Sequence, residues 1–301
     1  MIQHKSEIRF RALGSSCHIC VASADGRGEE LLALAKNELL RLESKFSTHQ
    51  PSSLVSKINS AAGSGNYTPL DKESRSLFEF ANALWRESNH QFDPSSEILR
   101  DCYCNGLPVK GSAALLKARL AHVGWNKVEF NDNGVRLFNR GMLVDLDGCV
   151  RPYAADSIRR ILLQHKVSSA LVSLDEDIAT IGKQHDGANW LVGVKYPKQS
   201  GVAIARLKLN YSGYAIRGDF KQSITIDGER YGTALSPVDG QPIPGLLSVG
   251  VMAESCLAAS GAASVARAKT EQSALNWLRG LGLPWVAIGR DMKSHGLLSA
   301  D

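Results

Sequence analysis

Apolar side chains recur every three to four residues in several parts of the chain, which is the spacing of amphipathic helices. The clearest example is 29–46, where Leu31, Ala35 and Leu39 fall on one face. Asp71 is placed to cap a second helix, because a run of the same period follows it directly. Helices are therefore expected over 29–46, 71–85, 112–123, the segment from Gly148 to His165, 257–269 and 271–279.

Short apolar runs bounded by Gly, Asn or Asp predict β-strands. The run 7–23 is broken at Gly14, and the run 128–138 is split by an Asn-Asp-Asn-Gly turn that is typical of a hairpin. Further strands are expected over 143–146, 170–174, 190–196, 202–209, 246–252 and 285–288, and another hairpin begins at 224–228. Because helices come early and strands late, with little β-α alternation, we expect an α+β fold with antiparallel-rich sheets.

Composition excludes several classes of protein. The 301 residues are 44% hydrophobic and 22% charged, as in ordinary globular proteins. The net charge of +5 comes without a dense basic run, so nucleic acid is not an expected partner. No apolar run reaches the roughly 18 residues of a transmembrane segment. No signal peptide is apparent, so the chain is expected in the cytoplasm, or in the periplasm if an export signal has been removed.

Six cysteines do not form a convincing metal pattern. Cys17 and Cys20 have the spacing of a zinc knuckle, but in a strand this offset directs the two thiols to opposite faces. A matching second pair is missing, because Cys102 and Cys104 are too close in sequence. Free thiols are the favoured interpretation.

The most informative motif runs from Leu143 to Asp156. An apolar run ends at Gly148 and a helix follows, so that backbone N–H groups and the positive end of a helix dipole face the same point. This geometry is typical of an anion site. Arg151 is either a phosphate clamp or a solvated residue at a helix start, where Pro152 is also favoured. The sequence leaves both readings open.

The segment resembles the central signature of the FAD:protein FMN transferase (ApbE-like) family, which reads Asp-Leu-Gly-Gly-Ile-Ala-Lys-Gly-Tyr-Ala-Ala-Asp. Here Tyr153 to Asp156 match, whereas Arg151-Pro152 replaces Lys-Gly. Other family motifs follow in order at Leu13-Gly14-Ser15, Ser53 to Asn59, Phe92-Asp93-Pro94 and Ser212-Gly213. The resemblance implies one ApbE-like domain over 1–301, in which a flavin-nucleotide cleft lies between sheet and loops. It assigns FAD binding to Gly14, Ser15, Ser53, Asn59, Phe92, Asp93, Gly148, Arg151, Tyr153, Asp156, Ser212 and Gly213.

The residues that carry the family chemistry differ. Thr233 stands where the family has a histidine, and Ser236 where it has an aspartate. Ser260 replaces an aspartate and Ser264 a threonine, the two side chains that bind Mg²⁺ in the family. Mg²⁺ prefers anionic oxygens, and it would neutralise charge during attack on the FAD pyrophosphate. The resemblance therefore implies a degenerate metal site, and no catalytic residue is assigned.

Two further questions stay open, a relocated metal site and the role of four aromatic side chains. Asp147 and Asp175 form a relocated metal site, or they are surface and capping acids. Phe92, Tyr153 and two later tyrosines, Tyr211 and Tyr214, stack on a flavin or adenine ring, or they belong to the core.

Three functions follow. The favoured hypothesis is a protein that binds a flavin nucleotide such as FAD, or another adenine dinucleotide, with FMN transfer to Ser or Thr of a redox partner weakened or lost. The second is an active transferase or FAD pyrophosphatase with a relocated metal site. The third is a non-enzymatic interaction protein on the same fold.

Overall fold

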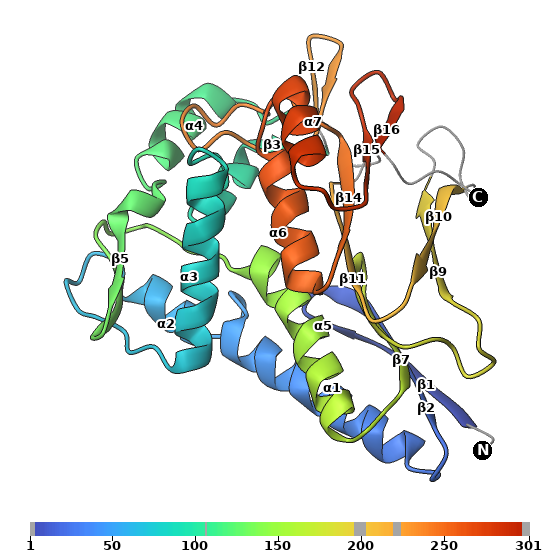
Figure 1. Cartoon of the computed structure of the whole chain (residues 1–301). Helices are drawn as coiled ribbons and strands as arrows, with labels where there is room; N and C mark the ends of the chain where they lie inside the picture. Colours follow the sequence, from blue (N-terminus) through green and yellow to red (C-terminus); the bar gives the residue numbers. More distant parts are fainter. Residues whose placement is uncertain (1–3, 106, 196–202, 219–223, 297–301) are drawn as a thin grey trace.

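The computed structural model describes residues 4–105, 107–195, 203–218 and 224–296, and one large antiparallel sheet organises them (Figure 1). Its strands, in spatial order, are β1 (His4–Ala12), β2 (Ser15–Ser23), β7 (Ser169–Leu174), β8 (Asp177–Ile181), β11 (Gly213–Arg217), β14 (Ser248–Ala253), β15 (Trp285–Ile288) and β16 (Ser294–Gly296). Every neighbouring pair in this sheet is antiparallel. The β1–β2 hairpin therefore lies at one edge, and β16 at the other.

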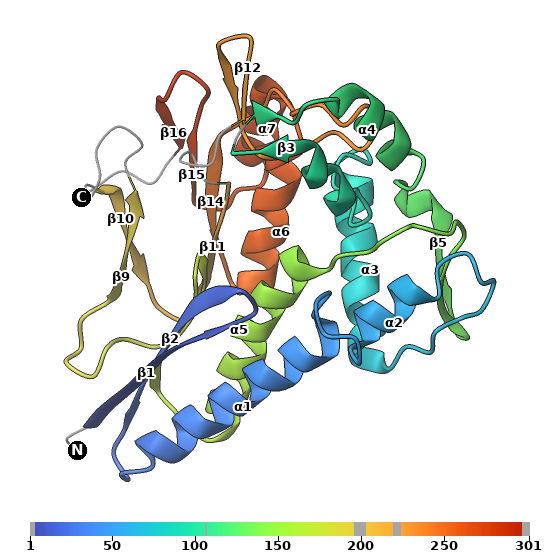
Figure 2. The same ribbon diagram turned by 180° about the vertical axis from the view of Figure 1, so that it is seen from behind.

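Helices cover one face of this sheet (Figures 1 and 2). The helices are α1 (Gly28–Phe46), α2 (Leu54–Ser60), α3 (Lys72–Glu87), α4 (Ser112–Leu120), α5 (Asp147–Gln164), α6 (Cys256–Arg267), α7 (Glu271–Gly280) and the 3₁₀ segments η1 (Ser96–Cys102) and η2 (Trp125–Lys127). Helix α1 packs on β1 and β2, α5 on β7 and β8, and α6 on β11 and β14. Helix α3 stands beside α6 and packs against both α5 and α6 (Figure 2).

Two-stranded ribbons complete the architecture. They are β3 (Tyr103–Cys104) with β4 (Leu107–Pro108), β5 (Val128–Asn131) with β6 (Gly134–Leu137), β9 (Trp190–Lys195) with β10 (Ala203–Leu209), and β12 (Ile224–Ile226) with β13 (Glu229–Tyr231). The β9–β10 ribbon covers the sheet face opposite the helices, where Trp190, Leu207 and Leu209 pack with Tyr214 (Figure 1).

Strand β2 shows how residue alternation divides the core. Cys17, Ile19 and Val21 face the helical side, whereas Cys20 joins the cluster under the β9–β10 ribbon. The two thiols point to opposite faces, as the strand periodicity predicts. Both are buried and unpaired, and burial raises the pKa of each thiol. They do not form a metal site together.

The α+β class and most expected elements are confirmed. Asp71 caps α3 by accepting a hydrogen bond from Ser74 N at 2.9 Å. Ends of two expected strands, at residues 196 and 202, lie outside the described residues. In the part of the chain that the structure describes, no helix is long and apolar enough to cross a bilayer.

Two expectations are wrong. Segment 143–146 is not a strand, although Val144 and Leu146 are buried. Its apolar side chains enter the core, but its backbone at Val144 pairs with a side chain instead of a neighbouring strand. The expected flavin loop from Ser53 to Asn59 is largely the short helix α2, because Ser53 caps it by accepting from Ser56 N.

Candidate functional site

A cleft of about 440 Å³ opens where the β1–β2 turn, the end of α1, η1 and the start of α5 meet. Leu13 and Gly14 form one wall, and the loop 47–50 after α1 forms the next. Glu97 of η1 is also part of the lining. Asp145, Asp147 and Val150 complete the lining from the segment that enters α5.

The β1–β2 turn is held rigidly on α1. Leu13 and Gly14 both have positive φ, at 49° and 67°. Such a two-residue turn matches the twist of the flanking strands, and glycine adopts it without steric cost. Leu13 N donates to Glu43 Oε1 at 2.6 Å, so a carboxylate from α1 fixes the turn beside the cleft.

Arg151 is not part of the cleft lining, but it follows the lining residue Val150 and joins three segments beside the cleft. Its Nη1 donates to Ser15 Oγ at 3.0 Å, and its Nη2 lies 3.0 Å from Asp147 Oδ2. Asp175, in the β7–β8 turn, is 3.9 Å from Nη1. Arg151 is therefore not a solvated arginine at a helix start. It lies between the two aspartates of the relocated metal site, and its charge opposes a cation there.

Asn59 and Ser53 support two segments that form the cleft. Asn59 Nδ2 donates to Val144 O at 3.0 Å, and Val144 N donates to Asn59 Oδ1 at 2.8 Å. This side chain thus replaces a strand partner for the segment that leads into α5. Ser53 Oγ donates to Ser47 O at 2.5 Å and so anchors the loop that lines the cleft. Neither residue lies in the cleft lining.

Asp93 is a buried cap and is not a cleft residue. Its carboxylate accepts from Ser95 N at 2.8 Å, Ser95 Oγ at 2.6 Å and Trp125 N at 2.8 Å. The adjacent Pro94 O accepts from Asp145 N at 2.9 Å, so this turn positions an acid that does line the cleft. Phe92 packs against the main core.

Two other expected flavin residues, Tyr153 and Asp156, hold helices together. Tyr153 donates its hydroxyl to Glu73 Oε1 at 2.9 Å and lies away from the cleft lining. Asp156 accepts from Cys256 N and Leu257 N, at 3.0 and 2.8 Å, and caps the start of α6. Burial raises the pKa of Asp156.

Ser212 and Gly213, at the start of β11, also connect elements of the fold. Ser212 O accepts from Thr180 N at 2.9 Å, which ties the start of β11 to β8. A Cβ at Gly213 would lie 2.0 Å from Cys256 N, so only glycine lets β11 approach α6 this closely. Of the aromatics considered from the sequence, Tyr214 is fully buried in the core, and Tyr211 is exposed.

Thr233 and Ser236, which replace the family histidine and aspartate, lie on either side of Leu235 in the sequence. Ser236 Oγ accepts from Val238 N at 3.3 Å within a tight loop that Leu235 and Pro242 close. Leu235 packs on Ile98 of η1. Neither Thr233 nor Ser236 is part of the cleft lining.

The position that the resemblance assigns to magnesium contains a guanidinium group. Arg217 Nη2 donates to Ser260 Oγ at 2.5 Å and to Asp177 Oδ1 at 2.7 Å. Ser260 Oγ donates in turn to Gly148 O at 3.4 Å, and Ser264 is buried one turn later on α6. Mg²⁺ requires near-octahedral oxygen ligands, with anionic oxygen preferred. A neutral hydroxyl that already contacts a cation does not fit this requirement.

Acidic residues make up half of the polar side chains that line the cleft. Glu97 and Asp145 both have raised pKa values, because desolvation in the concave site disfavours their charged forms and neighbouring carboxylates, Asp147 among them, add repulsion. Asp145 Oδ1 also accepts from Asp147 N at 2.6 Å, so it occupies part of the helix N-terminus where an anion was expected. Sequence reasoning missed Glu97 and Glu43 entirely, since no local pattern places η1 or α1 beside this turn.

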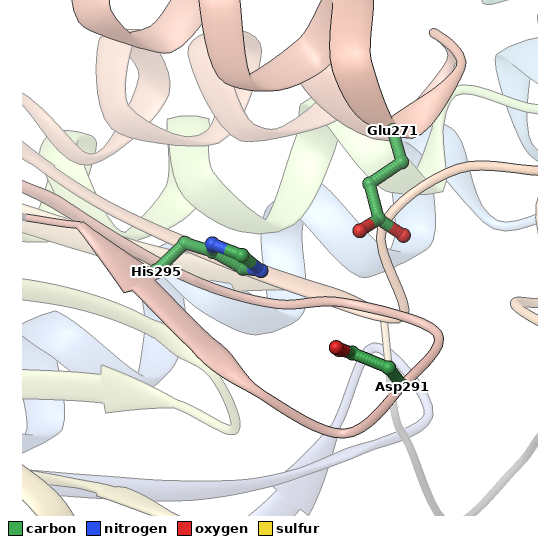
Figure 3. Close-up of side chains that lie close together, drawn as sticks. All are labelled: Glu271, Asp291 and His295. Atoms are coloured by element: carbon green, nitrogen blue, oxygen red, sulfur yellow. The ribbon is translucent and has the colours of Figure 1, made fainter.

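A second group of ionisable side chains lies elsewhere. Glu271, Asp291 and His295 bring one ligand atom each within 4.8 Å of the others (Figure 3). Both carboxylates already accept backbone hydrogen bonds, from Arg290 N and Lys293 N. The group lies at the β15–β16 edge of the sheet, whereas the cleft lies at the β1–β2 edge. The two sites therefore cannot act on one ligand together.

Comparison with known proteins places this architecture in a family. The model of the ApbE family matches residues 13–286. An FAD:protein FMN transferase of Klebsiella pneumoniae is 29% identical over 226 residues, which are 71% of this chain and 68% of that protein. Its counterpart from Salmonella typhimurium is 30% identical over 122 residues, so that match covers only 35% of the relative.

Solved structures agree over nearly the whole chain. The ApbE protein of Thermotoga maritima superposes with a TM-score of 0.84 at 26% identity, covering 97% of both chains. The flavin transferase ApbE of Vibrio cholerae gives a TM-score of 0.85 at 20% identity and shares the fold over 99% of this chain and 97% of that one. The motifs, the family match over residues 13–286 and these structures lead to one conclusion: this chain belongs to the ApbE family.

Proposed function

We propose that the cleft binds FAD and that the protein is a flavin-nucleotide binding member of its family. The observation that carries this proposal is the position of the cleft. Two of the matched motifs, the Gly14 turn and the segment before α5, form its walls. A third and a fourth, at Asn59 and Pro94, hold the segment before α5 in place through hydrogen bonds to Val144 and Asp145.

Arg151 is the cationic group that we assign to the FAD pyrophosphate. It is only 23% exposed and already fixed by Ser15 and Asp147, so little side-chain entropy is lost on binding. Guanidinium groups match phosphate oxygens in pairs. Arg151 also offsets part of the negative charge that Asp145 and Glu97 place around the cleft.

We further propose that transfer of FMN is weakened or lost. In the family reaction a Ser or Thr hydroxyl attacks the FMN phosphorus of FAD, a new P–O bond forms, and AMP leaves. Thr233 and Ser236 have no carboxylate or imidazole with which to accept the hydroxyl proton at neutral pH. The position of Ser260 does not supply the oxygens that Mg²⁺ requires.

One observation favours an alternative, an active transferase or FAD pyrophosphatase with metal held elsewhere. Glu97, Asp145 and Asp147 line the cleft and offer carboxylate oxygens close to the proposed pyrophosphate position. The pair Asp147 and Asp175 is a weaker candidate, because Arg151 already lies between them.

Titration of the purified protein with FAD, followed by flavin fluorescence, tests binding. We expect FAD to bind, and Arg151→Ala to weaken the affinity about 10- to 100-fold, as for the loss of charge-assisted hydrogen bonds worth roughly 1.5–3 kcal/mol. Arg160→Ala on the exposed side of α5 is the control and should leave the affinity unchanged. Absence of binding at millimolar FAD would refute the proposal.

Release of AMP from FAD separates the two chemical hypotheses, because both transfer and hydrolysis produce it. We expect AMP release at the background rate, with or without Mg²⁺. Mg²⁺-dependent AMP release that Asp147→Asn abolishes would instead establish the relocated metal site.

A further inference from the structure

Arg217 occupies a closed polar site between three elements. It ends β11, while its partners Asp177 and Ser260 come from β8 and α6. The Arg217 side chain is 15% exposed and Asp177 is 0% exposed. Ser260 Oγ links this group to Gly148 O at the start of α5, next to the cleft.

Arg217 and Asp177 form a buried ion pair, and nearby Glu176 also favours the charged guanidinium. Burial disfavours the charged form of Arg217, but the Asp177 carboxylate outweighs this effect and raises the pKa of the guanidinium. One positive and one negative charge therefore sit in direct contact at 2.7 Å. A divalent cation at Ser260 would add two positive charges beside a guanidinium, with no further acidic partner among these three residues.

The hydrogen bonds of Ser260 also disfavour a metal ion at this position. Its oxygen accepts from Arg217 and its hydroxyl proton points to Gly148 O. A metal ligand at this position would have to give up the contact with Arg217, and the buried guanidinium would lose a partner.

We infer that Arg217 is a resident cation that takes the place of the divalent metal at Ser260, so that any ligand of the cleft binds without magnesium. The exclusion of metal rests on Arg217 and not only on the loss of an acidic ligand at Ser260. The part that concerns the ligand rests on the proposed FAD binding, whereas the part that concerns the metal does not.

Mn²⁺ alone, followed by electron paramagnetic resonance, is the probe for the metal. We expect no Mn²⁺ bound at Ser260 in the native protein and none at this position in Ser260→Asp, because the Arg217 guanidinium still lies against position 260, where the metal would bind. The double variant Ser260→Asp/Arg217→Met should gain a Mn²⁺ site. Its affinity for Mn²⁺ should be at least about tenfold higher than that of the native protein or of Ser260→Asp. Ser260→Asp/Arg160→Met is the matched control and should stay metal-free. Tight Mn²⁺ binding by Ser260→Asp alone, or Ser260-dependent binding by the native protein, would overturn the inference.

The double variant remains interpretable even if it is unstable. Loss of Arg217 leaves Asp177 buried and unpaired, which is destabilising, but Mn²⁺ bound beside the carboxylate introduced at position 260 restores a positive charge there. We therefore expect Mn²⁺ to raise the melting temperature of this variant and not that of the native protein. If the double variant does not fold even with Mn²⁺, the behaviour of Ser260→Asp alone still decides.

The ligand is tested by FAD titration of the native protein in EDTA and in excess Mg²⁺. We expect equal affinities. FAD binding only in Mg²⁺ would overturn the inference while leaving the proposed function intact. Absence of FAD binding in both conditions would refute the proposed function, and the Mn²⁺ result would still stand or fall on its own.

Discussion

At the scale of single residues, charged groups in and near the cleft come with their own counter-ions. Arg151 is paired with Asp147, and Arg217 with Asp177. Asp145 accepts a backbone N–H at the start of α5. The chain thus supplies an anion of its own at the helix start and a cation of its own at Ser260, the positions at which the sequence predicted a bound anion and a metal.

The acids of the cleft make binding depend on pH. Protonation of Glu97 and Asp145, whose pKa values are raised above their usual 4.5 and 3.8, removes negative charge beside the anionic ligand. We expect FAD affinity to increase as pH falls through this raised range. The Glu97 side chain is 46% exposed and its carboxylate lies 2.9 Å from Arg100 Nε, so solvent and this ion pair screen its charge. Glu97→Gln should therefore bind FAD only about two- to threefold more tightly at pH 7, and it should flatten the pH profile. A steeper profile in Glu97→Gln would contradict this assignment.

The same groups affect stability with a defined sign. A raised carboxyl pKa in the folded state means that the folded protein binds more protons than the unfolded chain in this window. The contribution of Glu97 to the free energy of unfolding is therefore most favourable below pH 4.5 and decreases as pH rises through its folded pKa. The difference between native protein and Glu97→Gln in urea unfolding, measured across this range, isolates the effect.

At the scale of elements, one carboxylate joins three helices. Glu73 of α3 accepts from Arg41 Nη2 at 2.6 Å and Lys45 Nζ at 2.7 Å, both on α1, and from the Tyr153 hydroxyl of α5 at 2.9 Å. This network explains why Tyr153 matches the family motif without lining the cleft. It locks α1 and α5, which carry two of the cleft walls, against α3.

Loss of this carboxylate should loosen the helical layer. Hydrogen bonds from Arg41 first, and then from Lys45 and Tyr153, outweigh desolvation and lower the pKa of Glu73 from 4.5 to about 2. We expect Glu73→Gln to reduce the free energy of unfolding by about 1–3 kcal/mol at pH 7. Because the folded pKa is depressed, the stabilisation is present above pH 4.5 and is lost as pH falls toward about 2.

Urea unfolding at pH 7 and near pH 2 measures this difference. Glu79→Gln, an exposed position on the same helix, is the control and should change stability by less than about 0.5 kcal/mol. Equal destabilisation by Glu73→Gln at both pH values would mean that packing, and not the charge network, is responsible.

At the scale of the whole molecule, the long sheet separates two regions of polar side chains. The cleft lies at the β1–β2 edge, and the Glu271–Asp291–His295 group lies at the β15–β16 edge, seven strand spacings away. At about 4.8 Å per spacing this is at most roughly 34 Å, measured along the twisted sheet. Ligand binding at one edge should therefore leave the other unaffected.

Hydrogen exchange can map this separation. With saturating FAD we expect slower amide exchange in 12–16, 43–50, 94–97 and 144–151, the segments that form the cleft or support it. Exchange in α7, β15 and β16 should not change, because none of them contacts the cleft. Protection confined to the β15–β16 edge would place the ligand elsewhere and contradict the proposed site.

Much of this molecule was determined by the sequence alone, because helix and strand periodicity, caps and turn residues act over a few neighbours. Helix α1, the capping of α3 by Asp71 and the break at Gly14 followed from such local rules. The order of the family motifs indicated the family, and the order of helices and strands predicted the α+β class.

Other features were decided only by tertiary structure, because their partners are far apart in the chain. Segment 143–146 has the apolar pattern of a strand, yet Asn59, 85 residues away from Val144, satisfies its backbone. Nothing local to Arg217 indicates a role, because that role depends on Asp177 and Ser260, which are 40 and 43 residues away and come together only when β8, β11 and α6 pack. Periodicity reports which face of an element is buried, but the packing of elements decides which charges meet there.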